Sequence, residues 1–348
     1  MHELQADNFR HKHNRYIASW LFMCCLMVYG MVVLGGVTRL TGSGLSMVEW
    51  DPIFGIIPPL DAAAWNEAFE LYKQSPEYLK INIGMELDGF KNIYWFEYAH
   101  RVLGRAIGTV FLLPFLFFLA RGWINRALVP KLTGMFVLGG LQGLLGWYMV
   151  KSGLVDNPHV SQYRLTAHLG MAILIYAWMF HVALGLWFRD DQRITVTHGM
   201  RRGITLLTGL AFITILSGGF VAGLKAGFAY NTFPLMDGQW IPQIILMLDP
   251  VWRNFFENIA TVQFDHRVLA ILVFCAVLAI WVQSLRQHAA RRPGNAIHVL
   301  MAVAILQVAL GISTLLLHVP VTLASMHQAG ALLLFSTLLY LNQRTVAE

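Results

Sequence analysis

Charged residues are scarce in this chain. Asp, Glu, Lys and Arg make up 13% of its 348 residues, whereas hydrophobic residues make up 57%. A typical soluble domain carries about 25% charged residues, and the mean hydropathy here is +0.56. The composition therefore excludes an ordinary soluble protein and indicates an integral membrane protein.

Cysteine and targeting signals are also lacking. The three cysteines, Cys24, Cys25 and Cys275, all lie within apolar runs, so a disulfide framework in the loops is excluded. Residues 1–15 contain no apolar core and no small-residue cleavage site, so a removable signal or transit peptide is not expected. These features favour the plasma (inner) membrane of a bacterium.

Long apolar runs are abundant. A bilayer crossing needs roughly 20 mostly apolar residues, and the runs are continuous rather than alternating, which excludes a membrane β-barrel. We therefore predict an all-α protein with eight transmembrane helices. The runs cover residues 17–37, 98–120, 131–150, 165–188, 203–223, 264–285, 296–317 and 321–341.

The net charge of +6 reports topology rather than nucleic-acid binding. Lys and Arg concentrate in the two terminal segments and in alternate loops, whereas the remaining loops hold few. Because basic loops stay on the cytoplasmic side, we expect both termini there. The long segment 38–96, which is acidic, should then face outward.

The chain contains an internal repeat. His-Arg-Val-Leu at 100–103 recurs at 266–269, and Leu-Gln at 141–142 recurs at 306–307. The spacing between His159 and His168 matches that between His318 and His327. We predict two pseudo-symmetric four-helix bundles that enter the membrane in the same direction. The expected divisions are a tail at 1–15, halves at 16–190 and 203–342, a cytoplasmic linker at 191–202 and a tail at 343–348.

Four histidines, His100, His168, His266 and His327, carry the candidate chemistry. Each lies near the start of an even-numbered span, so all four should share one shallow depth below the outer surface. In each half, two imidazoles on different helices can ligate a haem iron axially. The alternatives are interfacial or hydrogen-bonded histidines and a zinc or copper site, although the Cys, Asp or Glu partners expected for those metals are lacking.

Three arginines near these histidines suit haem propionates. Arg101 and Arg267 each follow a candidate ligand, and Arg105 lies one turn beyond the first. Arginine binds carboxylates in bidentate fashion, but these side chains can equally extend to the membrane interface. In the third span, Gly139, Gly143 and Gly146 have the spacing of close helix packing.

The two halves differ at one acidic position. Glu97 lies three residues before His100, on the same helix face, whereas the matching residue before His266 is Gln263. A carboxylate beside a haem edge can accept a proton or stabilise positive charge in an oxidation. This asymmetry favours a reactive first site and an electron-transferring second site, unless Glu97 only supports a helix N-terminus.

Several motifs together resemble the haem A synthase family in its proteobacterial and mitochondrial branch. They are GGVTRLTGSGLSMVEW (35–50), EYAHR (97–101), QYRLTAHL (162–169), FDHR (264–267) and MHQ (326–328). The cysteine pair that some relatives carry in the first outer segment is lacking here.

The resemblance implies an enzyme that oxidises the C8 methyl group of haem O to a formyl group, which yields haem A for terminal oxidases. The reaction would pass through two hydroxylations and loss of water from a gem-diol. His100 and His168 would flank haem O with Glu97 beside its reactive edge, while His266 and His327 would ligate a resident haem b.

The expected partners follow from this resemblance. A haem O synthase would supply the substrate, terminal oxidase assembly factors would take part in delivering the product, and an electron acceptor is required. Segment 38–96 would cover the first haem or dock the donor, and the chain could form a homo-oligomer. No nucleic-acid partner is expected.

Two other functions fit the histidine pattern. A dihaem b-type cytochrome would transfer electrons from quinol without altering haem, although its haems would preferably lie near opposite membrane faces. A haem-binding or chaperone protein would not need Glu97.

Overall fold

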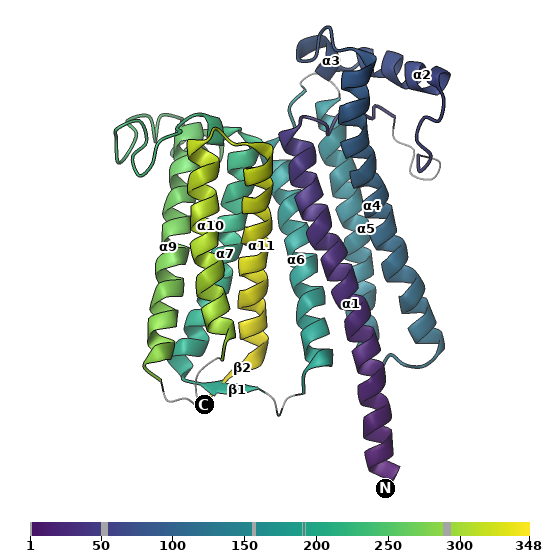
Figure 1. The fold of residues 1–348 in the computed structure, drawn as a ribbon, viewed down its shortest axis with the longest axis vertical. Helices are drawn as coiled ribbons and strands as arrows, with labels where there is room; N and C mark the ends of the chain where they lie inside the picture. Colours follow the sequence, from purple (N-terminus) through teal and green to yellow (C-terminus); the bar gives the residue numbers. More distant parts are fainter. Residues whose placement is uncertain (1, 50–54, 155–157, 190, 192, 288–293) are drawn as a thin grey trace.

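A computed structural model describes residues 2–49, 55–154, 158–189, 191, 193–287 and 294–348. Within these ranges, eight helices are long and apolar enough to cross a membrane, and each coincides with a predicted run. They are α1 (His2–Leu40), α4 (Leu87–Ala120), α5 (Val129–Gly153), α6 (Gln162–Trp187), α7 (His198–Gly223), α9 (Ile259–Leu285), α10 (Ala296–Leu316) and α11 (Val321–Arg344). The prediction of an all-α membrane protein is confirmed (Figure 1).

The helices alternate in direction, and their loops differ greatly in size at the two ends. Residues 41–49, 55–86 and 224–258 lie at one end, which we call the capped end, and both chain termini lie at the opposite end (Figure 1). Helices α4, α6, α9 and α11 all begin at the capped end. The shared side of the termini agrees with an even number of spans, whereas the membrane face to which each end belongs stays a prediction.

A short parallel pairing joins two segments at the end opposite the cap. Strand β1 (Ile194–Val196) pairs with β2 (Thr345–Ala347), so the expected linker and the C-terminal tail are bound together. The sequence analysis did not predict this contact because three-residue strands carry too short a pattern to recognise. In addition, α1 continues as helix through most of the expected N-terminal tail.

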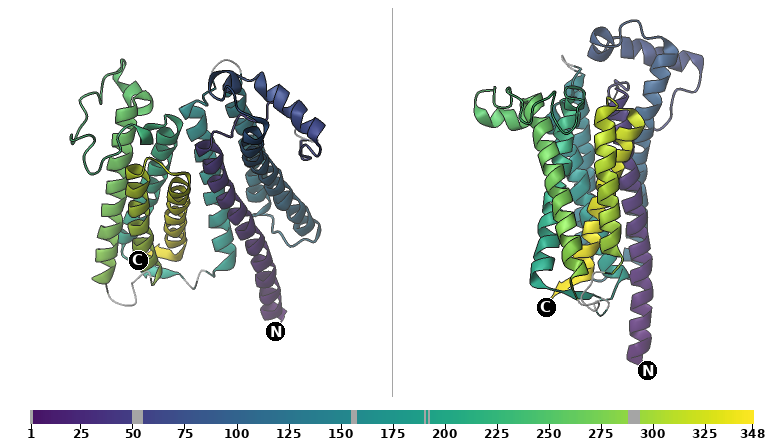
Figure 2. Two further views of the ribbon diagram at one scale, coloured as in Figure 1. Left: turned by 45° about the horizontal axis from the view of Figure 1, so that its top comes forward. Right: turned by 60° about the vertical axis from the view of Figure 1, so that its left-hand side comes forward.

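The eight helices form two groups of four (Figures 1 and 2). Helix α1 packs on α4 and α6 in one group, and α7 packs on α9 and α11 in the other. Across the boundary, α1 contacts α11 and α6 contacts α7. In both groups the first helix thus packs on the second and the fourth, as the repeat predicts. The symmetry between the two halves stays a prediction.

Hydrogen bonds fasten the boundary between the two groups. The Tyr29 hydroxyl on α1 donates to the carbonyl of Ala329 at 2.8 Å. Gln328 Nε2 on α11 donates to the carbonyl of Val32 at 2.9 Å. Since lipid is as apolar as a helix surface, such bonds and close packing hold membrane helices together. Gln328 follows His327 directly, so the boundary is fixed beside a candidate ligand.

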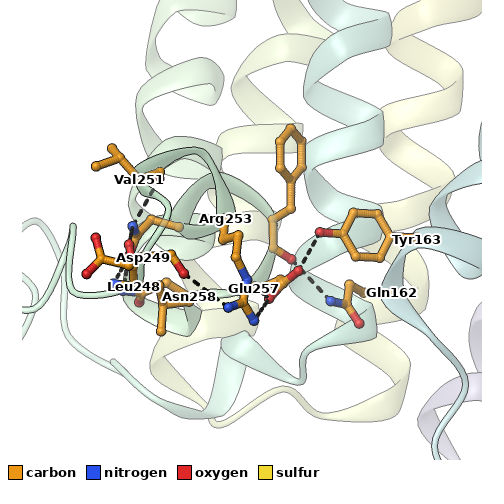
Figure 3. A network of polar contacts seen from close by, with 10 residues as sticks. Gln162, Tyr163, Leu248, Asp249, Val251, Arg253, Glu257 and Asn258 are labelled. Atoms are coloured by element: carbon orange, nitrogen blue, oxygen red, sulfur yellow. Dashed lines mark hydrogen bonds and ion pairs between the residues drawn. The ribbon is translucent and has the colours of Figure 1, made fainter.

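A second polar contact joins the groups at the capped end (Figure 3). Glu257, at the end of α8 (Asn254–Glu257), accepts hydrogen bonds from Tyr163 on α6 at 2.9 Å and from Arg253 at 2.6 Å. Gln162 Nε2 donates to the carbonyl of Phe256 at 3.4 Å. The Arg253–Glu257 pair is accessible to solvent, which screens its charges, so the pair adds little to stability.

The first part of the cap is a small aromatic subdomain. It contains α2 (Ala62–Lys73) and α3 (Pro76–Lys80), and Asp61 and Ser75 cap their N-termini. A separate apolar cluster joins α2 to the projecting start of α4, and its buried members are Phe69, Tyr72, Phe90 and Tyr94. The cap is therefore positioned by packing against α4.

A buried carboxyl group lies inside this subdomain. Glu77 on α3 is 6% exposed, and its closest polar contact is the Tyr72 hydroxyl, which donates to Oε2 at 3.2 Å. No cation lies within ion-pair distance of it in the described ranges. Burial is the main cause that raises the pKa of Glu77 to about 7; the hydrogen bond from Tyr72 and the charge of Lys225 oppose this rise, and the charge of Glu97 adds to it.

This raised pKa predicts that the cap loses stability as the pH rises. The folded cap favours protonated Glu77, so its stability is greatest below the ordinary pKa of 4.5 and falls until the pH exceeds about 7. Hydrogen exchange of the α2 amides should therefore be faster at pH 8 than at pH 5 after correction for intrinsic exchange. Glu77→Gln should remove this difference, whereas Glu70→Gln, at an exposed salt bridge, should retain it. An unaltered pH dependence in Glu77→Gln would contradict the assignment.

Candidate haem-ligand sites

The four candidate ligands lie on the four helices that begin at the capped end. His168 and His327 are the seventh residues of α6 and α11, and His266 is the eighth of α9, so three lie within about two turns of the helix start, as predicted. His100 is the fourteenth residue of α4, because α4 extends beyond its neighbours to carry the cap (Figure 1). The depth of the four histidines below the outer surface stays a prediction.

Each of these histidines lies against a glycine on the preceding membrane-spanning helix. A Cβ atom at that glycine would approach the ring closely, at distances tighter than ordinary van der Waals contact. The pairs are Gly35 with His100 (3.2 Å), Gly146 with His168 (2.9 Å), Gly218 with His266 (3.2 Å) and Gly311 with His327 (2.8 Å). Gly146, which the sequence indicated only as a packing residue, thus admits a ligand ring.

The second histidine pair has a spacing that fits a haem. The ring centres of His266 and His327 are 6.4 Å apart and the ring planes are almost perpendicular, at 86°. A ligating imidazole nitrogen lies about 2 Å from its metal and roughly 1 Å from its ring centre, so rings on opposite sides of one metal have centres roughly 6 Å apart. The pair therefore suits axial ligation of a haem iron.

The first pair has matching support. Gln142 Nε2 donates to the carbonyl of His168 at 2.9 Å, and Gln307 Nε2 donates to the carbonyl of His327 at the same distance. The Leu-Gln repeat that the sequence revealed thus fixes the backbone of one ligand in each half.

The alternative of a zinc or copper site gains no support. In the part of the chain that the structure describes, no three His, Cys, Asp or Glu side chains are grouped closely enough to hold a metal ion. Two axial histidines suit a group that brings its own in-plane donors, as a porphyrin does.

Glu97 is buried one turn from His100 and makes three hydrogen bonds. Its Oε2 accepts from Ser46 Oγ at 2.7 Å and from the backbone N–H of Met47 at 2.8 Å. Its Oε1 forms a 2.5 Å ion pair with Arg101. Glu97 does not cap the helix, which begins at Leu87; it binds the loop after α1 and adds a negative charge beside the first site.

Gln263 occupies the corresponding place with the opposite hydrogen-bond polarity. Its Nε2 donates to the carbonyls of Ala226 at 3.0 Å and Tyr230 at 3.2 Å. Its Oε1 accepts from Arg267 at 3.2 Å. The first loop thus presents donors to a carboxylate, and the second loop presents acceptors to an amide.

The three predicted propionate contacts all bind loops of the capped end. Arg101 donates to the carbonyls of Met47 and Glu49 as well as to Glu97. Arg105 donates to the carbonyl of Gly55 at 3.1 Å. Arg267 donates to the carbonyls of Tyr230 and Thr232, both at 2.9 Å. Their contact with propionates stays a prediction, and Trp50, at the end of the 35–50 motif, lies outside the described residues.

The sequence analysis missed Ser217 beside the second pair. Its hydroxyl lies 2.7 Å from His266 Nδ1. Ser217-Gly218-Gly219 on α7 corresponds to Leu34-Gly35-Gly36 on α1. This correspondence becomes visible only when the glycines are aligned by the histidines that they contact.

Replacement of a ligand-facing glycine should displace one ring and release one haem. We expect Gly146→Ala to lose haem from the first pair and Gly311→Ala from the second, because each added methyl group would lie under 3.0 Å from a ring carbon. Gly143→Ala is the matched control, since nothing lies within 4 Å of its added methyl group. Haem content per protein, measured by pyridine haemochrome spectra, would decide; equal content in all three variants would contradict the contact.

Comparison with known proteins assigns the family. The sequence profile of the cytochrome oxidase assembly protein family matches residues 18–339. The chain is 56% identical to the "Heme A synthase" of Nitrosospira multiformis, over 94% of this chain and 92% of that protein. It is 52% identical to that of Nitrosomonas eutropha (96% and 95%) and 46% identical to a heme A synthase of Arabidopsis thaliana (94% and 74%). This chain therefore belongs to the cytochrome oxidase assembly protein family.

Proposed function

We propose that this protein is a haem A synthase, an oxidoreductase that converts the C8 methyl group of haem O to a formyl group. The observation that carries the proposal is a difference in charge between two histidine pairs that occupy corresponding places in the repeat. The first pair has the buried, ion-paired Glu97 one turn away, and the second has the uncharged Gln263.

The two pairs receive different haems. His100 and His168 flank the substrate haem O, and His266 and His327 ligate a resident haem b. The 6.4 Å spacing of the second pair supports this use of its histidines. When bound, the resident haem supplies a one-electron redox centre that passes electrons to an acceptor.

The residues around the first pair bind, orient and stabilise charge. Conversion of a methyl to a formyl group removes two hydrogen atoms and adds one oxygen atom, so protons must leave the reacting carbon. Glu97 accepts such a proton or stabilises the positive charge that develops there. Its bonds from Ser46 and Met47 hold the carboxylate in place, and Arg101 neutralises it between turnovers.

The cap shields this chemistry on the outer side of a bacterial plasma membrane. The aromatic subdomain stands on the same helix as His100 and Glu97, so it covers the first site and provides a surface for a haem O synthase. The propionates of haem O are directed toward the capped end, where Arg101, Arg105 and Arg267 lie. Terminal oxidase assembly factors, an electron acceptor and a second copy of the chain remain proposed partners.

A dihaem b-type cytochrome is the second candidate. It would explain two bis-histidine sites but needs haems near both membrane faces to carry electrons across. All four histidines lie on helices that begin at the capped end, which disfavours this function.

Haem extraction after co-expression with a haem O synthase tests the proposal. Wild-type protein should yield haem A with haem B, and Glu97→Gln should accumulate haem O, with haem A at least tenfold lower. Glu97→Gln also disturbs local hydrogen bonds, because its amide would face the Met47 N–H. The control for this disturbance is Ser46→Ala. It loses one hydrogen bond, worth about 1 kcal/mol, but retains the carboxylate, so haem A should persist. Haem B alone in wild type, despite available haem O, would favour the cytochrome.

A further inference from the structure

Ser217 forms a directional hydrogen-bond chain with His266. The serine hydroxyl lies 2.7 Å from His266 Nδ1 and 2.8 Å from the carbonyl oxygen of Thr214. A carbonyl oxygen only accepts, and a hydroxyl carries one hydrogen. The hydroxyl hydrogen therefore points to Thr214, and Ser217 Oγ accepts a hydrogen from His266 Nδ1.

This count of hydrogens sets the tautomer of His266. A neutral imidazole carries one hydrogen, so a hydrogen on Nδ1 leaves the Nε2 lone pair free to bind iron. A donated Nδ1–H bond also fixes the orientation of a metal-ligating ring and raises the basicity of the ligating nitrogen. Ser217 thus prepares His266 for ligation from Nε2.

The other candidate ligands lack this support. The position that corresponds to Ser217 in the first half is Leu34, which has no hydroxyl group. His168 Nδ1 and His327 Nδ1 have no hydrogen-bond partner among the described protein groups. In the first pair, the contact to a ring nitrogen is that of Gln142 Nε2 with His168 Nε2 at 3.4 Å, on the nitrogen opposite to the one that Ser217 contacts in His266.

We propose that Ser217 is a positioning residue that marks the second site for a permanently bound haem. It fixes the Nδ1–H tautomer of His266, strengthens the Nε2–iron bond and thereby lowers the reduction potential of that haem. The first site has Leu34 in the corresponding position, so no hydroxyl group there can fix the tautomer of a ligand ring. This inference rests on the proposed function only in assuming that His266 and His327 ligate a haem.

The test compares Ser217→Ala with two controls in the full-length purified protein. Ser217→Thr retains a hydroxyl group and should behave as wild type. Thr214→Val removes a nearby hydroxyl that bonds to Leu210 but retains the Thr214 carbonyl, so it should also match wild type. Each protein is titrated potentiometrically at the absorbance of haem B, and its oxidised form is examined by electron paramagnetic resonance.

Ser217→Ala should lower the affinity for ferric haem relative to ferrous haem by up to about tenfold. This change raises the midpoint potential by up to about 59 mV for a one-electron couple. The low-spin signal of its ferric haem should shift, while Ser217→Thr and Thr214→Val keep the wild-type values. If Ser217→Ala loses haem B and Ser217→Thr retains it, the positioning role is again supported. An unchanged potential and signal in Ser217→Ala, or equal haem loss in both Ser217 variants, would overturn it.

His266→Ala separates this inference from the proposed function. If haem B in the wild-type protein does not depend on His266, the assignment of a resident haem fails, and the Ser217 proposal fails with it. If His266→Ala removes haem B but Ser217→Ala leaves its potential unchanged, only the Ser217 proposal fails.

Discussion

The close approach of helix backbones to four histidine rings is the constraint on which this structure depends. At each ligand a neighbouring helix has a glycine, because a side chain there would occupy the space of the ring. In a bilayer, where helix association gains little from the hydrophobic effect, small residues also allow the close packing that holds helices together. The same glycines therefore serve packing and ligation, which ties the position of each ligand to the packing of its half.

Two adjacent glycines extend this constraint from one site to the other. On α1, Gly35 faces His100 while Gly36 faces Gln328, the neighbour of His327. On α7, Gly218 faces His266 while Gly219 faces Thr166 on α6, two residues before His168. Each Gly-Gly pair thus contacts a ligand of its own half and the ligand-bearing helix of the other half. A displacement of either helix would alter both histidine pairs, so packing couples the positions of the two candidate sites.

The sequence predicted the eight spans correctly, and the repeat and the four histidines likewise stand on strong local patterns. Eight apolar runs specify helices by length, and His-Arg-Val-Leu marks the repeat by identity. It predicted less where contacts between distant segments of the chain decide the role of a residue. The start of α4 at Leu87 was not predicted because the residues before 98 do not form a long apolar run. Ser217 and the loop carbonyls around Arg267 were missed because their roles depend on helix rotation and loop path, which no single segment records.

The difference between Glu97 and Gln263 extends to the loops that contact them, because each loop offers the hydrogen-bonding groups that its own residue requires. Glu97 requires the hydroxyl of Ser46 and the N–H of Met47 on its side, and Gln263 requires the carbonyls of Ala226 and Tyr230. A carboxylate placed at 263 would meet two acceptors, and an amide at 97 would meet donors, so exchange of either residue leaves a buried polar mismatch that costs about 1–3 kcal/mol per unpaired group. The charge asymmetry is thus built into two different loops around one repeated helix, so it involves the surroundings of positions 97 and 263 as well as the two residues themselves.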